Sequence, residues 1–265
     1  MNLQNLHTDP TPLLRVRNVA KRYGDRVALH SASFDLWPGE VLAIVGESGS
    51  GKSTLLNAIA ARSRPDAGSV EFLGRDGQLQ DIHAMSEAQQ RLLARTDWGF
   101  VHQNPADGLR MDVSAGANVG ERLMGLGERH YGRLRCQAEE WLQRVEIDAI
   151  RIDDAPRTFS GGMRQRLQIA RNLVTQPRLV FMDEPTSGLD VSVQARLLDL
   201  LRGLTQQMQL AVVIVTHDLA VARLLAHRMA VMQRGEIVET GLTDQVLDDP
   251  QHPYTQLLVS SVLQP

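Results

Sequence analysis

The sequence predicts an α/β fold in which a mostly parallel sheet is covered by helices, and three observations support this. Short apolar runs at Val41–Val45, Leu179–Met182 and Leu210–Val215 have the length and composition of fully buried strands. The segment 193–204 places an apolar residue every three or four positions, which is typical of an amphipathic helix. A glycine-rich segment, residues 46–53, directly follows the first of these strands. Alternating buried strands and helices are typical of a parallel sheet with helices on its faces.

The N-terminal elements are predicted from alternation and from turn residues. Over Leu13–Val19, with Val16 on one side and Val19 on the other, the alternation predicts an edge or half-exposed strand. Pro38-Gly39 predicts a turn before the first buried strand. After the glycine-rich segment, Thr54–Ala61 is helical in composition, which completes a strand–loop–helix order.

The middle of the chain has a different character. From about residue 84 to residue 160 it carries charged stretches typical of helices, such as Ser86–Arg95 and Leu134–Val145, and few features typical of strands. We interpret this region as a helical insertion. Buried strands return at Leu179–Met182 and beyond.

Composition limits the class of protein. The net charge of −3 provides no general attraction to nucleic acid or to anionic lipid. The single cysteine, Cys136, cannot form an internal disulfide, which fits a reducing compartment. No apolar run approaches the roughly 20 residues that span a bilayer, and residues 1–12 lack the pattern of a signal peptide. We therefore expect a cytoplasmic protein with a loose N-terminal tail at 1–12, no membrane insertion and no nucleic-acid partner.

The glycine-rich segment matches G-x-x-x-x-G-K-[ST] in full. Its glycines allow successive backbone N–H groups to face one centre, and the next helix presents its positive N-terminus there. In this motif Lys52 reaches the β- and γ-phosphates and the Ser53 hydroxyl binds Mg²⁺. A glycine-rich turn that binds nothing is the alternative, but the strand before and the helix after favour a phosphate loop for ATP. The predicted phosphate-loop residues are Gly46, Glu47, Ser48, Gly49, Ser50, Gly51, Lys52, Ser53 and Thr54.

Two acidic residues follow the buried strand Leu179–Met182. Ligands of open α/β sheets bind at the carboxyl ends of the strands, which is where Asp183 and Glu184 lie. Asp183 is placed to join the Mg²⁺ shell, and Glu184 to polarise an attacking water as a general base. A solvated turn is the alternative for the pair alone. The phosphate loop earlier in the chain favours the functional interpretation.

Further motifs resemble those of ATP-binding-cassette (ABC) ATPases. Phe159–Arg166 resembles their signature motif, Ser187–Asp190 their D-loop, and His217, after the strand Val212–Thr216, their switch histidine. Gln103 matches the Q-loop glutamine, and Tyr23 lies where the family has its adenine-stacking aromatic residue. The resemblance extends over about residues 13–241.

The resemblance implies a nucleotide-binding domain at 13–245, with a RecA-like P-loop core, an antiparallel β edge subdomain and a helical insertion subdomain at about 84–160. Residues 246–265 would be a C-terminal tail of the oligopeptide-ATPase type. By resemblance Ser53, Gln103 and Asp183 build the Mg²⁺ shell, while Glu184, His217 and Gln103 act in catalysis and Tyr23 stacks on the base. The remaining expected nucleotide contacts are Ser160, Gly161, Gly162, Gln165 and Asp190.

Ser160, Gly161 and Gly162 open a second helix whose N-terminus is also suited to an anion. One nucleotide does not need two such termini from distant parts of one chain. In the family, the signature of one subunit closes on the γ-phosphate held by the other. The implied unit is a head-to-tail dimer with two ATP molecules between the chains.

The ATPase motifs do not identify the partner of the protein. Asp249–Thr255 resembles the tail of oligopeptide and dipeptide importer ATPases, which implies a membrane permease. The near-full length instead resembles the ATP-binding subunits of the carbon–phosphorus lyase system for phosphonate breakdown. The segments that carry this second resemblance are Phe34–Glu40, Arg95–Gln103, Asp107–Arg110, Ser114–Met124 and Arg151–Asp154.

The second resemblance is favoured, because Ala106–Arg110 replaces the Ser-Leu-Asn-Pro-like stretch that usually follows Gln103 in importers. It implies docking onto the lyase core subunits by a chain that does not itself break the carbon–phosphorus bond. It leaves open whether a related ABC ATPase chain also joins. A module that binds ATP without turnover is disfavoured, because Glu184, His217 and Ser160 are all present.

Overall fold

The computed structural model describes residues 11–262, so residues 1–10 of the expected N-terminal tail lie outside the described residues. Within the described range, one mixed ten-stranded sheet runs through the molecule in the order β5-β4-β1-β2-β10-β9-β3-β8-β7-β6. Its strands are β1 (Leu14–Tyr23), β2 (Arg26–Leu36), β3 (Val41–Val45), β4 (Ala67–Leu73), β5 (Leu79–Asp81), β6 (Trp98–Val101), β7 (Leu179–Asp183), β8 (Ala211–Thr216), β9 (Arg228–Gln233) and β10 (Glu236–Leu242).

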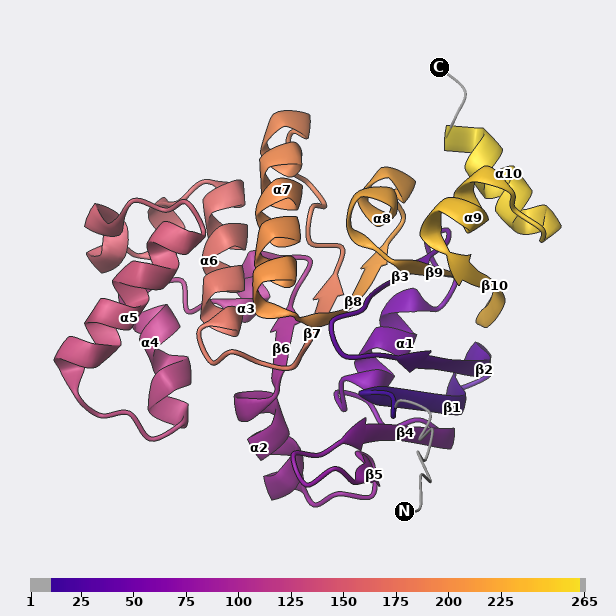
Figure 1. Cartoon of the computed structure of the whole chain (residues 1–265), viewed down its shortest axis with the longest axis horizontal. Helices are drawn as coiled ribbons and strands as arrows, with labels where there is room; N and C mark the ends of the chain where they lie inside the picture. Colours follow the sequence, from indigo (N-terminus) through magenta and orange to yellow (C-terminus); the bar gives the residue numbers. More distant parts are fainter. Residues whose placement is uncertain (1–10, 263–265) are drawn as a thin grey trace, which may run out of the picture.

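Helices cover both faces of this sheet and extend beyond one end of it (Figure 1). In Figure 1 the magenta helices α4 and α5 form a group apart from the sheet, and the yellow C-terminal helices lie at the opposite end of the molecule. The helices are α1 (Lys52–Ile59), α2 (Glu87–Thr96), α3 (Pro105–Gly108), α4 (Ala115–Gly125), α5 (Tyr131–Arg144), α6 (Gly161–Leu173), α7 (Val191–Met208), α8 (Leu219–Leu225), α9 (Thr243–Asp248) and α10 (Pro253–Val262), with 3-10 turns η1 (Ala149–Asp153) and η2 (Pro156–Thr158).

The two halves of the sheet differ in strand direction. Strands β9, β3, β8, β7 and β6 pair in parallel. At the other side β1 pairs antiparallel with both β2 and β4, and β4 pairs antiparallel with β5. The predicted α/β class, with a mostly parallel core and an antiparallel β edge, is therefore confirmed.

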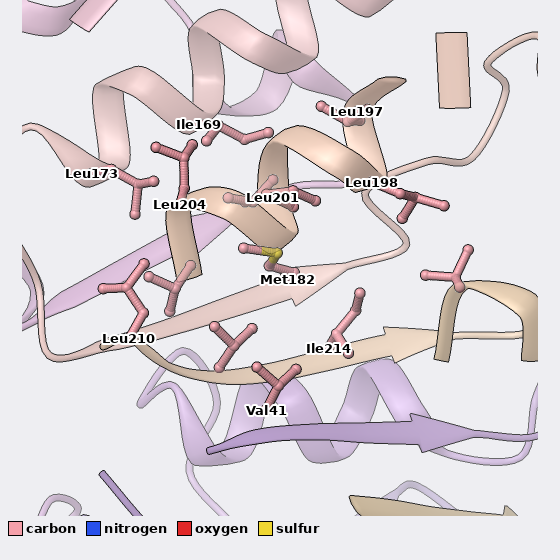
Figure 2. Close-up of a cluster of buried hydrophobic side chains, with 14 of the residues drawn as sticks. Val41, Ile169, Leu173, Met182, Leu197, Leu198, Leu201, Leu204, Leu210 and Ile214 are labelled. Carbon is pink, nitrogen blue, oxygen red and sulfur yellow. The ribbon is translucent and has the colours of Figure 1, made fainter. Parts of the chain in front are cut away.

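Side chains of the parallel strands alternate between two hydrophobic clusters, one on each face. On β3, Val41 belongs to the cluster under α6 and α7, whereas Leu42 belongs to the cluster that contains α1. Figure 2 shows leucines of α7 and α6 above Met182, Ile214 and Val41 of three neighbouring strands. Because both faces are covered, these strands are apolar throughout, and their carboxyl ends are held at one edge where the loops emerge.

The structure corrects two expectations about strands. The strand at the N-terminus is half-exposed, which is one of the two predicted alternatives, but it is not an edge strand, since β1 has a neighbour on each side. Its register shifts between Val16 and Val19, where Asn18 has a φ of +49°, and both valines are fully buried as a result. In addition, β6 pairs with β7 inside the range predicted to be a helical insertion. The glycine and aromatic residues of this short strand did not show the alternation on which the prediction relied.

Helix α6 covers the open edge of β6 with two buried amide side chains. The Phe100 N–H donates to Oδ1 of Asn172 over 3.0 Å, and the His102 N–H donates to Oε1 of Gln168 over 2.6 Å. Nε2 of Gln168 returns a bond to the His102 carbonyl over 3.1 Å. Backbone groups of an edge strand need such partners when they are buried. The helix that begins at Ser160 is therefore joined to the residue before Gln103.

Candidate active site

The phosphate loop connects β3 to α1, and its glycines are needed where they stand. Gly46 has a φ of +150° and Gly51 a φ of +106°, conformations that residues with a Cβ rarely adopt. A Cβ on Gly46 would lie 2.2 Å from the Met232 carbonyl oxygen, and one on Gly51 would lie 2.6 Å from the Ala28 carbonyl oxygen. The loop is thus packed directly against neighbouring backbone, which fixes its shape before any ligand binds.

Lys52 lies within the curve of the loop. Its Nζ donates to the carbonyl oxygens of Gly46 at 2.7 Å and of Glu47 at 2.8 Å. An ammonium group has three N–H donors, so one remains for a phosphate oxygen. Burial lowers the pKa of Lys52, and the negative charges of Glu184, Asp183 and Glu47 oppose that shift. These hydrogen bonds fix the positively charged side chain of Lys52 at the centre of the loop.

Ser53 and Asp183 form an oxygen pair at the carboxyl end of β7. The Ser53 hydroxyl donates to Oδ1 of Asp183 over 3.1 Å. Burial raises the pKa of Asp183, although the hydrogen bond from Ser53 acts in the opposite direction. Hydroxyl and carboxylate oxygens are ligands that Mg²⁺ prefers. The donor set fits a magnesium ion that shares its remaining positions with phosphate oxygens and water.

Glu184 contacts the two other predicted catalytic residues, Gln103 and His217. Its carboxylate accepts a hydrogen bond from Nε2 of Gln103 over 3.1 Å, and its Oε1 lies 3.1 Å from Nδ1 of His217. Gln103 also donates to the hydroxyl of Ser187 over 3.2 Å. Glu184 itself has a φ of +42°, a strained conformation that costs about 1–3 kcal/mol. Its N–H donates to the Val215 carbonyl, so the neighbouring strand holds the carboxylate in place.

These groups open into one cleft of about 1150 Å³, a volume large enough for a nucleotide. The structure therefore brings most of the predicted nucleotide and catalytic residues together, while Ser50 is buried within the loop itself. Tyr23 lies at the mouth of the cleft and is 52% exposed. The predicted residues that line the cleft are Tyr23, Gly46, Glu47, Ser48, Gly49, Gly51, Lys52, Ser53, Thr54, Gln103, Glu184 and His217.

Several cleft residues were not predicted from the sequence. Arg26 is the first residue of β2, and Arg234 lies in the turn between β9 and β10. Both are exposed and both carry a charge suited to phosphate. Leu258 and Ser261 come from α10, close to the C-terminus. No local motif surrounds any of these residues. They reach the loop through contacts between segments that are far from it in the sequence.

A second group of predicted residues lies outside the cleft. Ser160 caps α6 by accepting a hydrogen bond from the Met163 N–H over 3.3 Å. A Cβ on Gly162 would lie 2.5 Å from Cγ1 of Val193, so α6 and α7 approach closely there. Asp190 precedes α7, is exposed, and makes no capping bond with its side chain. Ser160, Gly161, Gly162 and Asp190 are thus absent from the cleft that holds the phosphate loop of the same chain.

Gln165 corrects one expectation. It was predicted to contact nucleotide, but only 2% of it is exposed. Its Nε2 donates to the His102 carbonyl, and its Oε1 accepts a hydrogen bond from Gln168. Because α6 turns this side chain towards the protein interior, Gln165 supports the segment before Gln103 and does not face a ligand.

The comparisons with known proteins agree with this geometry. The sequence model of the ABC transporter family matches residues 29–187, which is more than half of the chain. The chain belongs to the ABC transporter family. The prediction of an ATP-binding, ABC-type ATPase is thereby confirmed at the level of the family. A second model, of the C-terminal region of oligopeptide and dipeptide transporters, matches residues 238–265.

Two relatives show which ABC ATP-binding proteins this chain resembles in sequence. The chain is 66% identical over 253 residues to the putative phosphonates utilization ATP-binding protein PhnK of Escherichia coli, covering 96% of this chain and 98% of the relative. It is 37% identical over 261 residues to a putative peptide import ATP-binding protein of Brucella ovis, covering 96% of this chain and 80% of the relative. The resemblance to a phosphonate-utilisation ATP-binding protein is therefore confirmed.

A solved structure has the same fold. The ATP-binding cassette MJ0796, in a dimeric post-hydrolysis state bound to ADP and phosphate, superimposes with a TM-score of 0.77 and 30% identity, covering 87% of this chain and 98% of that one. Within residues 11–262, no helix has both the length and the apolar character needed to cross a membrane.

Proposed function

We propose that the protein hydrolyses ATP at the interface of a head-to-tail dimer and drives a step of a carbon–phosphorus lyase complex in phosphonate breakdown. One observation carries the proposal. The phosphate loop, Gln103, Glu184 and His217 share one open cleft, whereas the signature residues Ser160–Gly162 lie outside it. Such a site is complete only when a second chain supplies its signature.

The chain's own residues have separate tasks in this proposal. Lys52 and the loop N–H groups bind the phosphates. Ser53, Asp183 and Gln103 would hold a magnesium ion, which when bound would supply positive charge close to the phosphate oxygens. Glu184 accepts a proton from the attacking water, and its hydrogen bond with Gln103 and its contact with His217 orient it for that transfer.

Substitution of Glu184 by Gln tests the general base. The amide keeps the shape of the side chain but cannot accept the proton, so turnover should fall about 10²–10⁴-fold while ATP binding persists. Glu140→Gln is the matched control, because Glu140 is exposed on α5. Near-normal hydrolysis by the Glu184→Gln chain would remove Glu184 from this role.

Mixed dimers test the proposed sandwich. When Ser160→Arg and Glu184→Gln are carried by different chains of one dimer, a head-to-tail arrangement leaves one site with a normal base and a normal signature. When both changes are on one chain and the other is wild type, neither site is intact. If each site were built from one chain alone, the first combination would have no intact site and the second would keep one. That result would contradict the head-to-tail dimer. Ser86→Arg, at the N-cap of α2, controls for the effect of the substitution on a helix cap.

The partner is proposed from the relative named for phosphonate use and from the segment after Gln103. Ala106–Arg110 departs from the stretch that is usual in importers. Within it, a Cβ on Gly108 would lie 2.4 Å from Oε1 of Gln168, so glycine leaves room for this buried amide. In this proposal the chain supplies ATP-driven motion to the lyase core subunits, a related ABC ATPase chain is a candidate further partner, and carbon–phosphorus bond cleavage belongs to other subunits.

An ATP-binding subunit of an oligopeptide or dipeptide importer is the second candidate. It is supported by the family match at residues 238–265 and by the peptide-import relative. The two candidates differ in where the partner resides. An importer subunit should be recovered with a detergent-extracted permease, and a lyase subunit with proteins that need no detergent.

A further inference from the structure

The C-terminal helix α10 contacts the phosphate loop directly. The Glu47 N–H donates to the hydroxyl of Tyr254 over 3.1 Å, although the two residues are 207 positions apart. Tyr254 is 6% exposed, so this hydroxyl is largely shielded from water. Glu47 itself is exposed, and this bond gives its N–H a fixed partner within the protein. Tyr254 supplies it from outside the loop.

The start of α10 is itself anchored. The carboxylate of Glu239, on β10, accepts hydrogen bonds from the backbone N–H groups of Gln251 and His252, each over 2.9 Å. Burial alone would raise the pKa of Glu239, but these N–H donors outweigh it and the pKa lies below its usual range. Tyr254 follows two residues after His252. The hydroxyl is therefore presented from a segment tied to the central sheet.

The Glu47 N–H, whose hydrogen bond Tyr254 accepts, and the Gly46 carbonyl, which accepts from Nζ of Lys52 at 2.7 Å, belong to one peptide unit. The Glu47 carbonyl accepts from Nζ of Lys52 at 2.8 Å and from the Ser50 N–H at 3.2 Å. On the other side of the loop, the Gly235 N–H donates to the Ser50 carbonyl over 2.8 Å. Residues outside the loop thus hold it at Glu47 and at Ser50. The loop N–H groups that are available to phosphate lie between these two residues and after Ser50.

The contact between α10 and the loop is mainly polar. A cavity of about 210 Å³ lies between them, and its lining includes Glu47, Ser50, Tyr254 and Leu257. Apolar side chains therefore do not fill this space. If the hydrogen bond between Tyr254 and Glu47 is lost, no close packing of side chains replaces it. On the cleft side, Leu258 and Ser261 of the same helix line the main cavity.

We infer that Tyr254 is a positioning residue for the phosphate loop, so that α10 acts as part of the nucleotide site. The inference rests on the proposed assignment of the loop to ATP. Loss of the hydroxyl leaves the Glu47 N–H without its partner and lets the start of the loop move. The cost appears in nucleotide affinity, because an unanchored loop must be ordered when the phosphates bind.

The test is Tyr254→Phe in the full-length protein, with a fluorescent ATP analogue as the probe. The ring is retained and only the hydroxyl is lost. The dissociation constant and the KM for ATP should rise about three- to tenfold, while kcat changes less than about twofold. Glu239→Gln, which weakens the anchor of α10, should shift affinity in the same direction. Tyr131→Phe, on an exposed tyrosine of α5, is the matched control and should leave affinity unchanged.

Three results would overturn the inference: unchanged affinity in Tyr254→Phe, an equal change in Tyr131→Phe, or a fall in kcat with constant KM. A lower melting midpoint with unchanged affinity would give Tyr254 a purely structural role and would also overturn it. Lys52→Ala separates the two proposals. If that chain still binds the analogue normally, the assignment of the loop to ATP fails. If it does not bind and Tyr254→Phe equals wild type, only the role of Tyr254 fails.

Discussion

Substitution of Gly108 by Ala should destabilise the protein through one buried amide. The new methyl group would lie 2.4 Å from Oε1 and 2.9 Å from Cδ of Gln168. That oxygen accepts the His102 N–H over 2.6 Å, and Gln168 is 0% exposed, so the amide cannot move into solvent. Displacing it leaves a buried N–H without a partner, which costs about 1–3 kcal/mol, and overpacking adds a comparable amount. We expect a loss of about 2–6 kcal/mol in the free energy of unfolding.

A double-mutant cycle measured by urea denaturation separates this contact from the other effects of the new methyl group. In a Gln168→Ala background the obstacle is gone, and Gly108→Ala should then cost less than about 0.5 kcal/mol. Gly203→Ala in α7 is the control with the opposite sign. Nothing lies within 4 Å of its new methyl group, and alanine favours the helix by up to about 1 kcal/mol. Additive costs in the cycle, or a neutral Gly108→Ala variant, would refute the proposed contact.

The remaining predictions concern the loop and its acidic neighbour. Lys52→Ala should raise the dissociation constant for ATP at least about tenfold, because the ammonium is the cation held inside the loop, and unchanged affinity in a fluorescence titration would exclude it from the phosphate site. Gly51→Ala should lower the free energy of unfolding by at least about 1–3 kcal/mol in urea, since its φ of +106° and the Ala28 carbonyl both oppose a Cβ. Asp183 has a raised pKa in the folded state, so its favourable contribution to stability exists below the usual Asp value and is lost as pH rises through the raised pKa. Asp183→Asn should therefore raise the melting midpoint of the nucleotide-free protein at pH 7, and an unchanged or lower midpoint would contradict the shift.

The centre of the site could be predicted from the sequence because its chemistry is local. The phosphate loop is one continuous segment, and a strand before it and a helix after it are visible in composition. Asp183 and Glu184 follow directly from the end of a buried strand. The structure shows that these segments meet in one cleft, as parallel strands with aligned carboxyl ends require.

Other parts of the site depend on contacts between distant residues. Tyr254 reaches Glu47 only because β10 carries the C-terminal segment back to the loop. The inward orientation of Gln165 depends on how α6 rotates against β6, which no motif in its own sequence expresses. The register shift at Asn18 brings Val19 to the buried side of β1, so simple alternation misplaced Val19.

We propose that ATP-driven closure of this chain serves a carbon–phosphorus lyase complex. The most direct measurement is capture of a tagged Glu184→Gln chain from its native host grown on a phosphonate, with and without Mg·ATP. We expect recovery of carbon–phosphorus lyase subunits without detergent, in larger amount when ATP holds the dimer closed. Recovery of a membrane permease alone, and only after detergent extraction, would contradict it.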